Sequence, residues 1–387
     1  MKRRAHLYVY TFLLMFAIGL ALPISPLLAL RLGANWIEIG IMGSAWGIVF
    51  TLSAFMTGRL SDVIGRKPVL AFSSVLSALA ALMFLRASTI TELIVTRALE
   101  GLAWACFWPP MEALATETAD AQEVGKGIGR VTSIYALGFA AGSSVAGSIT
   151  SFFGLHLAFA VYFVVASIAL TVLWYVKAPR HVRRVETSAR TGVSSLLTSH
   201  VVVAGNILGA SYTFGLATVM ALLSAYATGL GISLFWIGIV FSVFWTGRIL
   251  GAALAGGASD RFGRKQVASL ALVIGAGGFI IIALVSDLPY LATGVFLAGL
   301  SVGATFPVNV AIIADGVELK SRGTAMGLYE MVCALAFMVS SALGGVSAEA
   351  LSPRSPYAMS AAVFVSCAVA LSIFLPPRHL KSREVFA

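Results

Sequence analysis

Twelve long apolar segments occupy nearly the whole of this 387-residue chain. A helix needs about 20 residues to cross the ~30 Å hydrocarbon core of a bilayer, and helices satisfy all of their backbone hydrogen bonds internally there. The segments predicted to span the membrane are roughly residues 7–30, 37–57, 68–88, 90–112, 127–151, 155–177, 198–227, 234–256, 266–286, 289–313, 323–347 and 355–376. They predict an all-α membrane protein with twelve transmembrane helices, and they leave no room for a soluble domain.

The charged residues are few, and their placement indicates how the chain lies in the membrane. With the N-terminus in the cytoplasm, 21 Lys and Arg residues fall in the inner segments and 3 in the outer loops. This asymmetry follows the positive-inside rule. It predicts a multi-pass protein of the cell (plasma) membrane with both termini cytoplasmic. The net charge of +10 is therefore explained by the basic residues that orient the chain in the lipid bilayer. For this reason nucleic acid is not an expected partner.

A short charged loop between two apolar segments occurs twice in the chain. Aligning residues 39–67 with 237–265 without a gap gives 12 identities in 29 positions. Each copy joins an even-numbered span to the next, so the two halves have the same orientation, as in parallel transporter repeats. The predicted organisation is an N-terminal six-helix bundle at residues 1–177, a cytoplasmic linker at 178–197 and a C-terminal six-helix bundle at 198–387.

The two loops resemble the signature of the major facilitator superfamily. The residues that carry the resemblance are Gly58, Asp62, Gly65, Arg66 and Lys67 in the first copy and Gly256, Asp260, Arg261, Gly263, Arg264 and Lys265 in the second. The first copy has Val63 where the signature has a basic residue. The resemblance implies two pseudo-symmetric six-helix bundles that work by alternating access. It also implies that this loop latches the halves together when the central cavity faces outward.

The residue types of the loop also have direct physical reasons. Gly58 and Gly65 allow close helix approach and unusual backbone angles in a tight turn. Asp62 is expected near the start of the following helix, where it can pair with an arginine. Arg66 and Lys67 are expected at the cytoplasmic interface. A simpler interpretation is that the basic pair only anchors the topology.

The fourth span contains the first group of candidate site residues. Arg97, Glu100, Trp104 and Trp108 recur at spacings of three and four, which places them along one stripe of a helix. A charge at the bilayer centre costs ~2.5–3.5 kcal/mol and normally faces the protein interior or water. The resemblance implies that span four lines the central cavity. The stripe is therefore a candidate substrate or coupling site, and a structural Arg97–Glu100 ion pair is the alternative.

The second half contains further polar residues inside apolar spans. Arg248 and Glu330 are expected at similar depth, ~12–13 Å from the inner ends of their helices. They are potential partners, and a paired acid within the membrane is a candidate proton carrier; a purely structural bridge explains them equally well. Asn206 and Asn309 could place polar groups in the cavity. Glu112, by contrast, is interpreted as one partner in surface pairing near Arg66 and Arg130.

Other chemistry has little support in the sequence. Cys106, Cys333 and Cys367 lie inside apolar spans without metal-ligand spacing, and they are interpreted as small buried residues. There is no Walker motif, metal-ligand cluster or catalytic arrangement. We therefore expect no enzyme activity, no cofactor and no metal.

A second motif bears on the direction of transport. The glycine-rich stretch at Gly138, Gly142 and Gly147 is similar to the span-five motif of proton-coupled exporters, with Ser143 in place of its proline. The chain thus resembles the drug/proton antiporter-like group. We predict a monomeric secondary transporter that uses protons to export a small amphipathic or lipophilic compound. Uptake or exchange of a sugar, an organic anion or another metabolite, a proton-independent uniporter and a non-transporting membrane sensor are the alternatives.

Overall fold

The computed structural model describes residues 2–117, 124–176, 199–317 and 322–374 and contains only helices among them. In chain order the helices are α1 (Lys2–Arg31), α2 (Trp36–Ile64), α3 (Arg66–Arg86), α4 (Ile90–Glu117), α5 (Val124–Phe153), α6 (Leu155–Leu173), α8 (His200–Gly229), α9 (Leu234–Phe262), α10 (Arg264–Leu284), α11 (Leu288–Gly316), α12 (Arg322–Ala350) and α13 (Ser355–Phe374). The predicted all-α fold with twelve long helices is confirmed. The linker predicted at 178–197 lies outside the described residues.

Most of these helices are suited to a bilayer by length and composition. Eleven of them are long and apolar enough to cross a membrane. The exception is α4, which carries Arg97, Glu100 and the two prolines at 109 and 110. These residues lower its mean hydropathy, but Arg97 and Glu100 are buried inside the protein, so the polarity of α4 faces inward.

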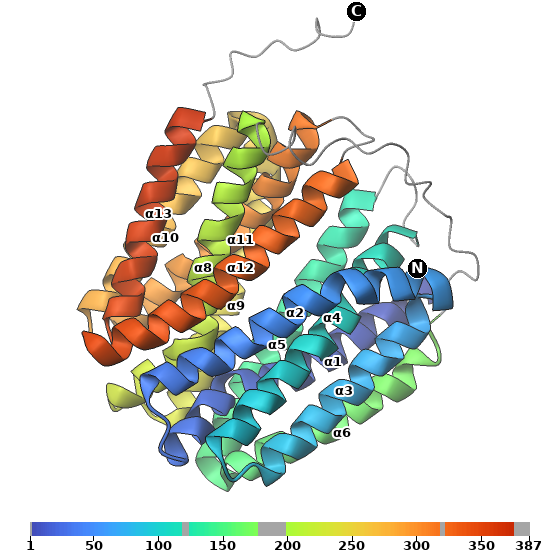
Figure 1. The fold of residues 1–387 in the computed structure, drawn as a ribbon, viewed down its shortest axis with the longest axis vertical. Coiled ribbons are helices and arrows are strands. Elements are labelled where there is room, and N and C mark those ends of the chain that lie inside the picture. The colour runs from blue at the N-terminus through green and yellow to red at the C-terminus, as the bar shows by residue number, and fades with distance from the viewer. Residues whose placement is uncertain (1, 118–123, 177–198, 318–321, 375–387) are drawn as a thin grey trace, which may run out of the picture.

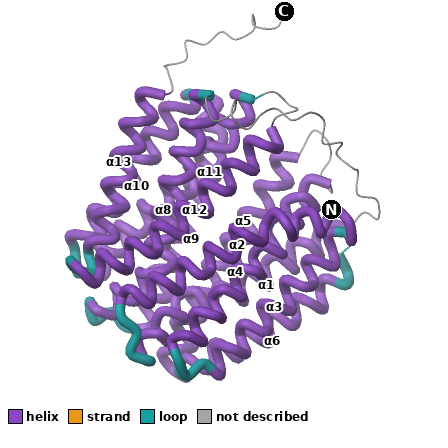
Figure 2. The backbone as a smooth tube through the Cα atoms, viewed as in Figure 1, coloured by secondary structure: helices purple, strands orange, loops and turns teal. Residues whose placement is uncertain are grey.

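The helices form two bundles that lie side by side (Figure 1), α1–α6 in one and α8–α13 in the other. Among the described residues, short turns join α1 to α2, α2 to α3, α3 to α4 and α5 to α6, and likewise α8 to α9, α9 to α10, α10 to α11 and α12 to α13 (Figure 2). Gly65 joins α2 to α3 with a φ of 95°, and Gly263 joins α9 to α10 with a φ of 97°. Only glycine adopts this region without strain. We call the end of the molecule that carries these two turns the motif face, and the end where α2 begins the opposite face.

The two bundles meet closely toward the opposite face through a repeated pair of helix crossings. Gly40 of α2 packs on Gly345 of α12, and Gly238 of α9 packs on Gly147 of α5. A Cβ at Gly40 would lie 2.6 Å from the Ser341 carbonyl oxygen, and one at Gly238 would lie 2.5 Å from the Ser143 carbonyl oxygen. Both crossings therefore require glycine. We call these four glycines the seal.

Hydrogen bonds reinforce both crossings. Ser44 Oγ donates to the Met338 carbonyl at 2.9 Å, and Ser242 Oγ donates to the Ala140 carbonyl at 2.6 Å. Adding 198 to Ser44 gives Ser242, and adding 198 to Ala140 gives Met338, so the two contacts are repeat equivalents. The internal repeat that relates the two loops in the sequence thus also relates the two crossings that join the bundles.

Candidate substrate cavity

A cavity of about 1160 Å³ lies between the two bundles. Its walls come from the motif-face portions of α1, α4, α5, α9, α11 and α12. Gly129 and Arg130, at the start of α5, are both exposed and belong to its lining. The cavity therefore reaches the surface at the motif face, while the seal closes the bundles together toward the opposite face. The two bundles are thus separated by a cavity at one end and packed together at the other.

A smaller pocket of about 140 Å³ adjoins the cavity toward the centre of the molecule. Arg248, Glu330 and Phe306 line both spaces. Aromatic rings form much of the wall of the small pocket, which we call the inner pocket; they belong to Trp46, Phe50, Trp104, Trp108, Tyr135, Phe139, Tyr212, Trp245, Phe306 and Phe337. Its walls are therefore suited to apolar and aromatic groups, with a small number of polar contacts.

Arg248 is midway along α9 and is buried at the junction of the two spaces. Its Nη1 donates a hydrogen bond of 2.7 Å to Tyr135 Oη of α5. Its guanidinium carbon lies 5.2 Å from the centroid of the Tyr135 ring and 5.0 Å from that of Trp245. Among the described residues, Arg248 has no ion pair with Glu330. Sequence reasoning left that pairing open, and the partner found is instead an aromatic hydroxyl from the other bundle.

Two carboxylates line the large cavity from opposite bundles. Glu112 belongs to α4 and Glu330 to α12. The two groups are near enough to interact electrostatically. The interpretation of Glu112 as a surface residue paired with arginine is therefore not what the geometry favours. Next to Glu330 in the chain, Tyr329 Oη of α12 shares a hydrogen bond of 3.0 Å with Tyr212 Oη of α8. Tyr212 lines the inner pocket, whereas Tyr329 is absent from the lining of either space.

The four residues of the span-four stripe separate into two groups. Trp104, Trp108 and Arg97 line the inner pocket, whereas Glu100 is absent from its lining. Glu100 forms an ion pair with Arg97 and accepts a hydrogen bond of 3.2 Å from Tyr162 Oη of α6. The Glu100 side chain is thus directed toward the interior of the N-terminal bundle, which favours the structural reading of the ion pair over a role at the site.

The two asparagines predicted to face the cavity are absent from the lining of either space. Asn309 is fully buried in α11, and a Cβ added at Gly205 of α8 would lie 3.1 Å from its Oδ1. Neither its Oδ1 nor its Nδ2 has a hydrogen-bond partner among the described residues, and Asn206 Oδ1 lacks one too. Both amides therefore lie in helix packing with unsatisfied polar atoms.

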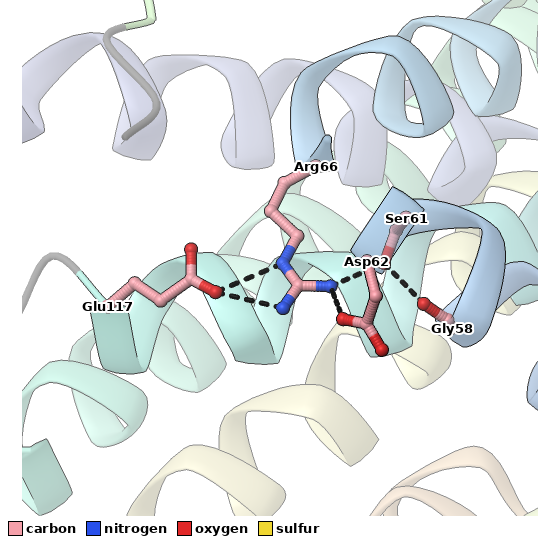
Figure 3. Close-up of polar contacts among 5 residues, drawn as sticks. All are labelled: Gly58, Ser61, Asp62, Arg66 and Glu117. Carbon is pink, nitrogen blue, oxygen red and sulfur yellow. Dashed lines mark hydrogen bonds and ion pairs between the residues drawn. The ribbon is translucent and has the colours of Figure 1, made fainter. Parts of the chain in front are cut away.

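The first charged loop forms a compact network at the motif face (Figure 3). Arg66, the first residue of α3, is paired with Asp62 and donates to Glu117 Oε1 from Nε at 3.1 Å and from Nη2 at 2.9 Å. Its Nη1 also donates to Ser61 Oγ at 2.7 Å. Asp62 lies in the last turn of α2, not within α3. The network thus ties α2, α3 and α4 together within the N-terminal bundle.

The second loop builds the same network 198 residues later. Arg264 pairs with Asp260, donates from Nε to Asp315 Oδ2 at 3.2 Å and from Nη1 to Ser259 Oγ at 2.8 Å. The lysines that follow behave alike, since Lys67 Nζ donates to the Trp174 carbonyl and Lys265 Nζ to the Ser372 carbonyl. Gly58 and Gly256 have no close contact that a Cβ would disturb, and Arg261 stacks over the adjacent Phe262 ring.

Among the inner-pocket residues that sequence reasoning missed, Tyr135 and Trp245 are the two that contact Arg248. Both are buried, their ring centroids lie 5.5 Å apart at an interplanar angle of 89°, and both contact Arg248. The available signal was weak. Trp245 stands three residues before an arginine inside an apolar span, a spacing that places the two on neighbouring positions of a helix. The sequence around Tyr135 does not distinguish it from an ordinary aromatic residue of the core.

Comparison with known proteins identifies the architecture. Residues 7–226 and 205–386 match the sequence profile of the Major Facilitator Superfamily. An uncharacterized MFS-type transporter of Methanocaldococcus jannaschii is 23% identical over 365 residues, which cover 92% of this chain and 93% of that protein. The quinolone resistance protein NorA of Staphylococcus aureus is 23% identical over 141 residues, which cover 36% of each chain.

A solved structure agrees with the sequence comparison. The nucleoside transporter NupG superimposes with a TM-score of 0.77 at 14% identity, covering 96% of this chain and all of that one. At this identity the likeness shows the fold alone. The family profile, by contrast, matches both halves of the sequence, and the structure has the twin bundles, the repeated loops and the central cavity. The chain belongs to the Major Facilitator Superfamily of membrane transporters.

Proposed function

We propose that the protein is a proton-coupled transporter that exports small amphipathic or lipophilic compounds by alternating access. The observation that carries the proposal is the wall of the inner pocket, which is largely aromatic and apolar and has Arg248 and Glu330 as its charged groups besides Arg97. Such a wall accepts apolar compounds and orients them through a few polar contacts. NorA, named for quinolone resistance, is the relative that favours export.

The coupling role is assigned to Glu330. It lies in both the cavity and the inner pocket, so it contacts the space that the substrate would occupy. The charged and titratable groups around it are Glu112 of α4, Arg248 of α9 and Tyr212 of α8, together with Tyr329 and Cys333 of its own helix. Protonation changes the charge of the Glu330 carboxylate, so the affinity of the cavity for substrate would depend on whether Glu330 carries a proton.

The distribution of basic residues along the chain supports a proposal on orientation. We propose that the motif face is cytoplasmic, that both termini lie on that side of the plasma membrane, and that the chain acts as a monomer. The structure would then correspond to the state in which the cavity is open to the cytoplasm. An exporter would load its substrate in this state.

Proteoliposomes with an imposed pH gradient test this proposal. The purified protein is supplied with a panel of neutral, cationic and anionic amphipathic compounds, with sugars and nucleosides included for the uptake alternative. We expect pH-driven movement of amphipathic compounds by the wild type. We expect Glu330→Gln to lose pH-driven movement while it still exchanges substrate at equal pH on both sides.

Asp287→Asn is the matched control, because Asp287 is exposed at the start of α11 and makes no side-chain capping bond. Full pH-driven activity in Glu330→Gln would remove Glu330 from the coupling role. Movement of sugars or nucleosides in place of amphipathic compounds would favour the uptake alternative. The nucleoside transporter NupG has a similar fold. No movement of any compound would point to a sensor.

A further inference from the structure

We propose that Arg248 binds the negative group of an amphipathic organic monoanion, whose apolar ring lies among the aromatic side chains of the inner pocket. This inference rests on the proposed function, because it names the class of compound that the transporter would carry. It is argued from the charge, burial and packing of Arg248 and of its neighbours.

Arg248 is held rigidly at the place where a ligand would meet it. The side chain is buried, with 9% of its surface exposed, yet it lines both the cavity and the inner pocket. Its guanidinium group contacts the faces of two rings that belong to opposite bundles, Tyr135 and Trp245, in cation–π geometry. A cation fixed in this way loses little conformational freedom when it binds an anion.

Among the described residues, Arg248 forms no ion pair with a carboxylate, although Glu330 lines the same two spaces. Other buried arginines in the described part of the chain are paired: Arg97 with Glu100, and Arg66 with Asp62 and Glu117. Arg248 has no ion pair among the described residues, and its one hydrogen bond there goes to the neutral hydroxyl of Tyr135. A guanidinium group has five donors in a fork that matches a carboxylate. The remaining donors are therefore available to an anion in the cavity.

The surroundings of Arg248 define the rest of the ligand. The rings of Trp104 and Trp108 are nearly parallel, with centroids 6.1 Å apart and an interplanar angle of 4°, and Phe139 stacks on Trp245 with centroids 4.5 Å apart. These surfaces favour a flat apolar ring. Glu330 lines the same pocket, so a second negative charge on the ligand would be repelled. A compound with one ring and one negative charge satisfies all three conditions.

The test measures binding, not transport. Three compounds with the same carbon skeleton serve as probes: the anion 3-phenylpropionate, the neutral 3-phenylpropanol and the cation 3-phenylpropylammonium. Each is titrated calorimetrically into the full-length protein in lipid nanodiscs, and empty nanodiscs give the partitioning background. We expect the wild type to bind the anion at least about tenfold more tightly than the alcohol, the ratio that a charge-assisted hydrogen bond provides.

Two substitutions locate the preference. Arg248→Gln should bind the alcohol as the wild type does and lose the preference for the anion, whereas Arg248→Lys should retain part of it. Arg86→Gln is the matched control, because Arg86 is exposed at the end of α3, and it should behave as the wild type. If Arg248→Gln does not fold, the wild-type and Arg248→Lys titrations still decide the question.

Equal binding of the anion and the alcohol by the wild type would overturn the proposal, as would tighter binding of the cation or an unchanged preference in Arg248→Gln. Because these measurements involve no gradient and no flux, they are independent of transport. Arg248-dependent binding of 3-phenylpropionate without movement in proteoliposomes would support the anion site and contradict the proposed function. Transport of amphipathic compounds without any preference for the anion in binding would support the proposed function and contradict the anion site.

Discussion

Arg66 and Arg264 occupy equivalent positions in the two halves, and each bonds a carboxylate 51 residues further along the chain, Glu117 and Asp315 respectively. The equivalence extends to the serine and aspartate that precede each arginine. Each copy of the loop thus forms an ion-pair network that joins three helices of its own bundle; we call these two networks the fasteners. In this state, with the cavity open at the motif face, the contacts of both arginines among the described residues stay within their own bundles.

The two fasteners differ in burial, which leads to a prediction on stability. The Arg66 side chain is 9% exposed and that of Arg264 is 25% exposed. An ion pair that is screened by water contributes little to the stability of the fold. Breaking a less exposed pair costs more, because it leaves the carboxylates without their positively charged partner. We expect Arg66→Gln to lower the unfolding temperature of the detergent-purified protein clearly more than Arg264→Gln does. Equal shifts, or a larger one for Arg264→Gln, would contradict this account of the asymmetry.

Asp62→Asn tests the function of the first loop. The substitution keeps the shape of the side chain and removes its charge, so it weakens the contact with Arg66 while Glu117 and Ser61 remain as partners. We therefore expect normal membrane insertion but several-fold slower transport in vesicles. The resemblance to the superfamily implies that the loop helps to latch the two halves together. Unchanged transport would contradict that role and would leave the loop as an anchor of the topology.

The seal gives a prediction on conformation. A side chain at Gly238 would collide with the Ser143 carbonyl oxygen across the α5–α9 crossing. Gly238→Val should therefore disfavour the state seen here and open the opposite face. A cysteine at Ser44, buried in the equivalent crossing, reports the change through labelling by a membrane-impermeant maleimide in a chain whose native cysteines are replaced.

Gly229→Val is the control for this experiment, because a Cβ there would have no neighbour within 4 Å. Labelling of the Ser44→Cys site should rise severalfold with Gly238→Val and stay at the background level with Gly229→Val. If neither substitution changes the labelling, the crossing does not control access from the opposite face.

Tyr135→Phe examines how Arg248 is positioned. The substitution removes the hydroxyl that accepts the 2.7 Å hydrogen bond and retains the ring under the guanidinium group. Arg248 should then be less well oriented, so binding of 3-phenylpropionate should weaken by a few-fold while binding of 3-phenylpropanol is unchanged. Equal weakening of both probes in nanodisc titrations would instead indicate a general loss of packing.

The sequence predicts the fold far better than the site, and the reason is physical. Apolar length, charge asymmetry and an ungapped repeat each act over many residues, so twelve helices in two related bundles follow from several independent signals. A site depends on which side of one helix faces a cavity. For a helix buried all round, apolar periodicity does not distinguish the cavity from the bundle interior.

Particular residues show this limit. Arg97, Glu100 and Trp104 lie on one stripe by spacing, but Arg97 and Trp104 line the inner pocket while Glu100 bonds Tyr162 within its own bundle. Glu112 reads as a surface residue because it lies near the end of its helix, yet the opening between the bundles exposes that end to the cavity. The partner of Arg248 comes from the other bundle, a relationship that no local spacing encodes.

Arg97 and Glu100 provide the sharpest stability test. Glu100 is buried, paired with Arg97 and bonded to Tyr162, so Glu100→Gln leaves a buried guanidinium group without its counter-charge. Losing one member of a buried pair costs about 3–5 kcal/mol, whereas replacing both members by apolar residues is often neutral. We expect Glu100→Gln to lower the unfolding temperature strongly and the double variant Arg97→Met with Glu100→Leu to restore most of it. If the double variant is also transport-competent, the pair is structural. If it is stable but inactive, Arg97, which lines the inner pocket, is needed for transport itself.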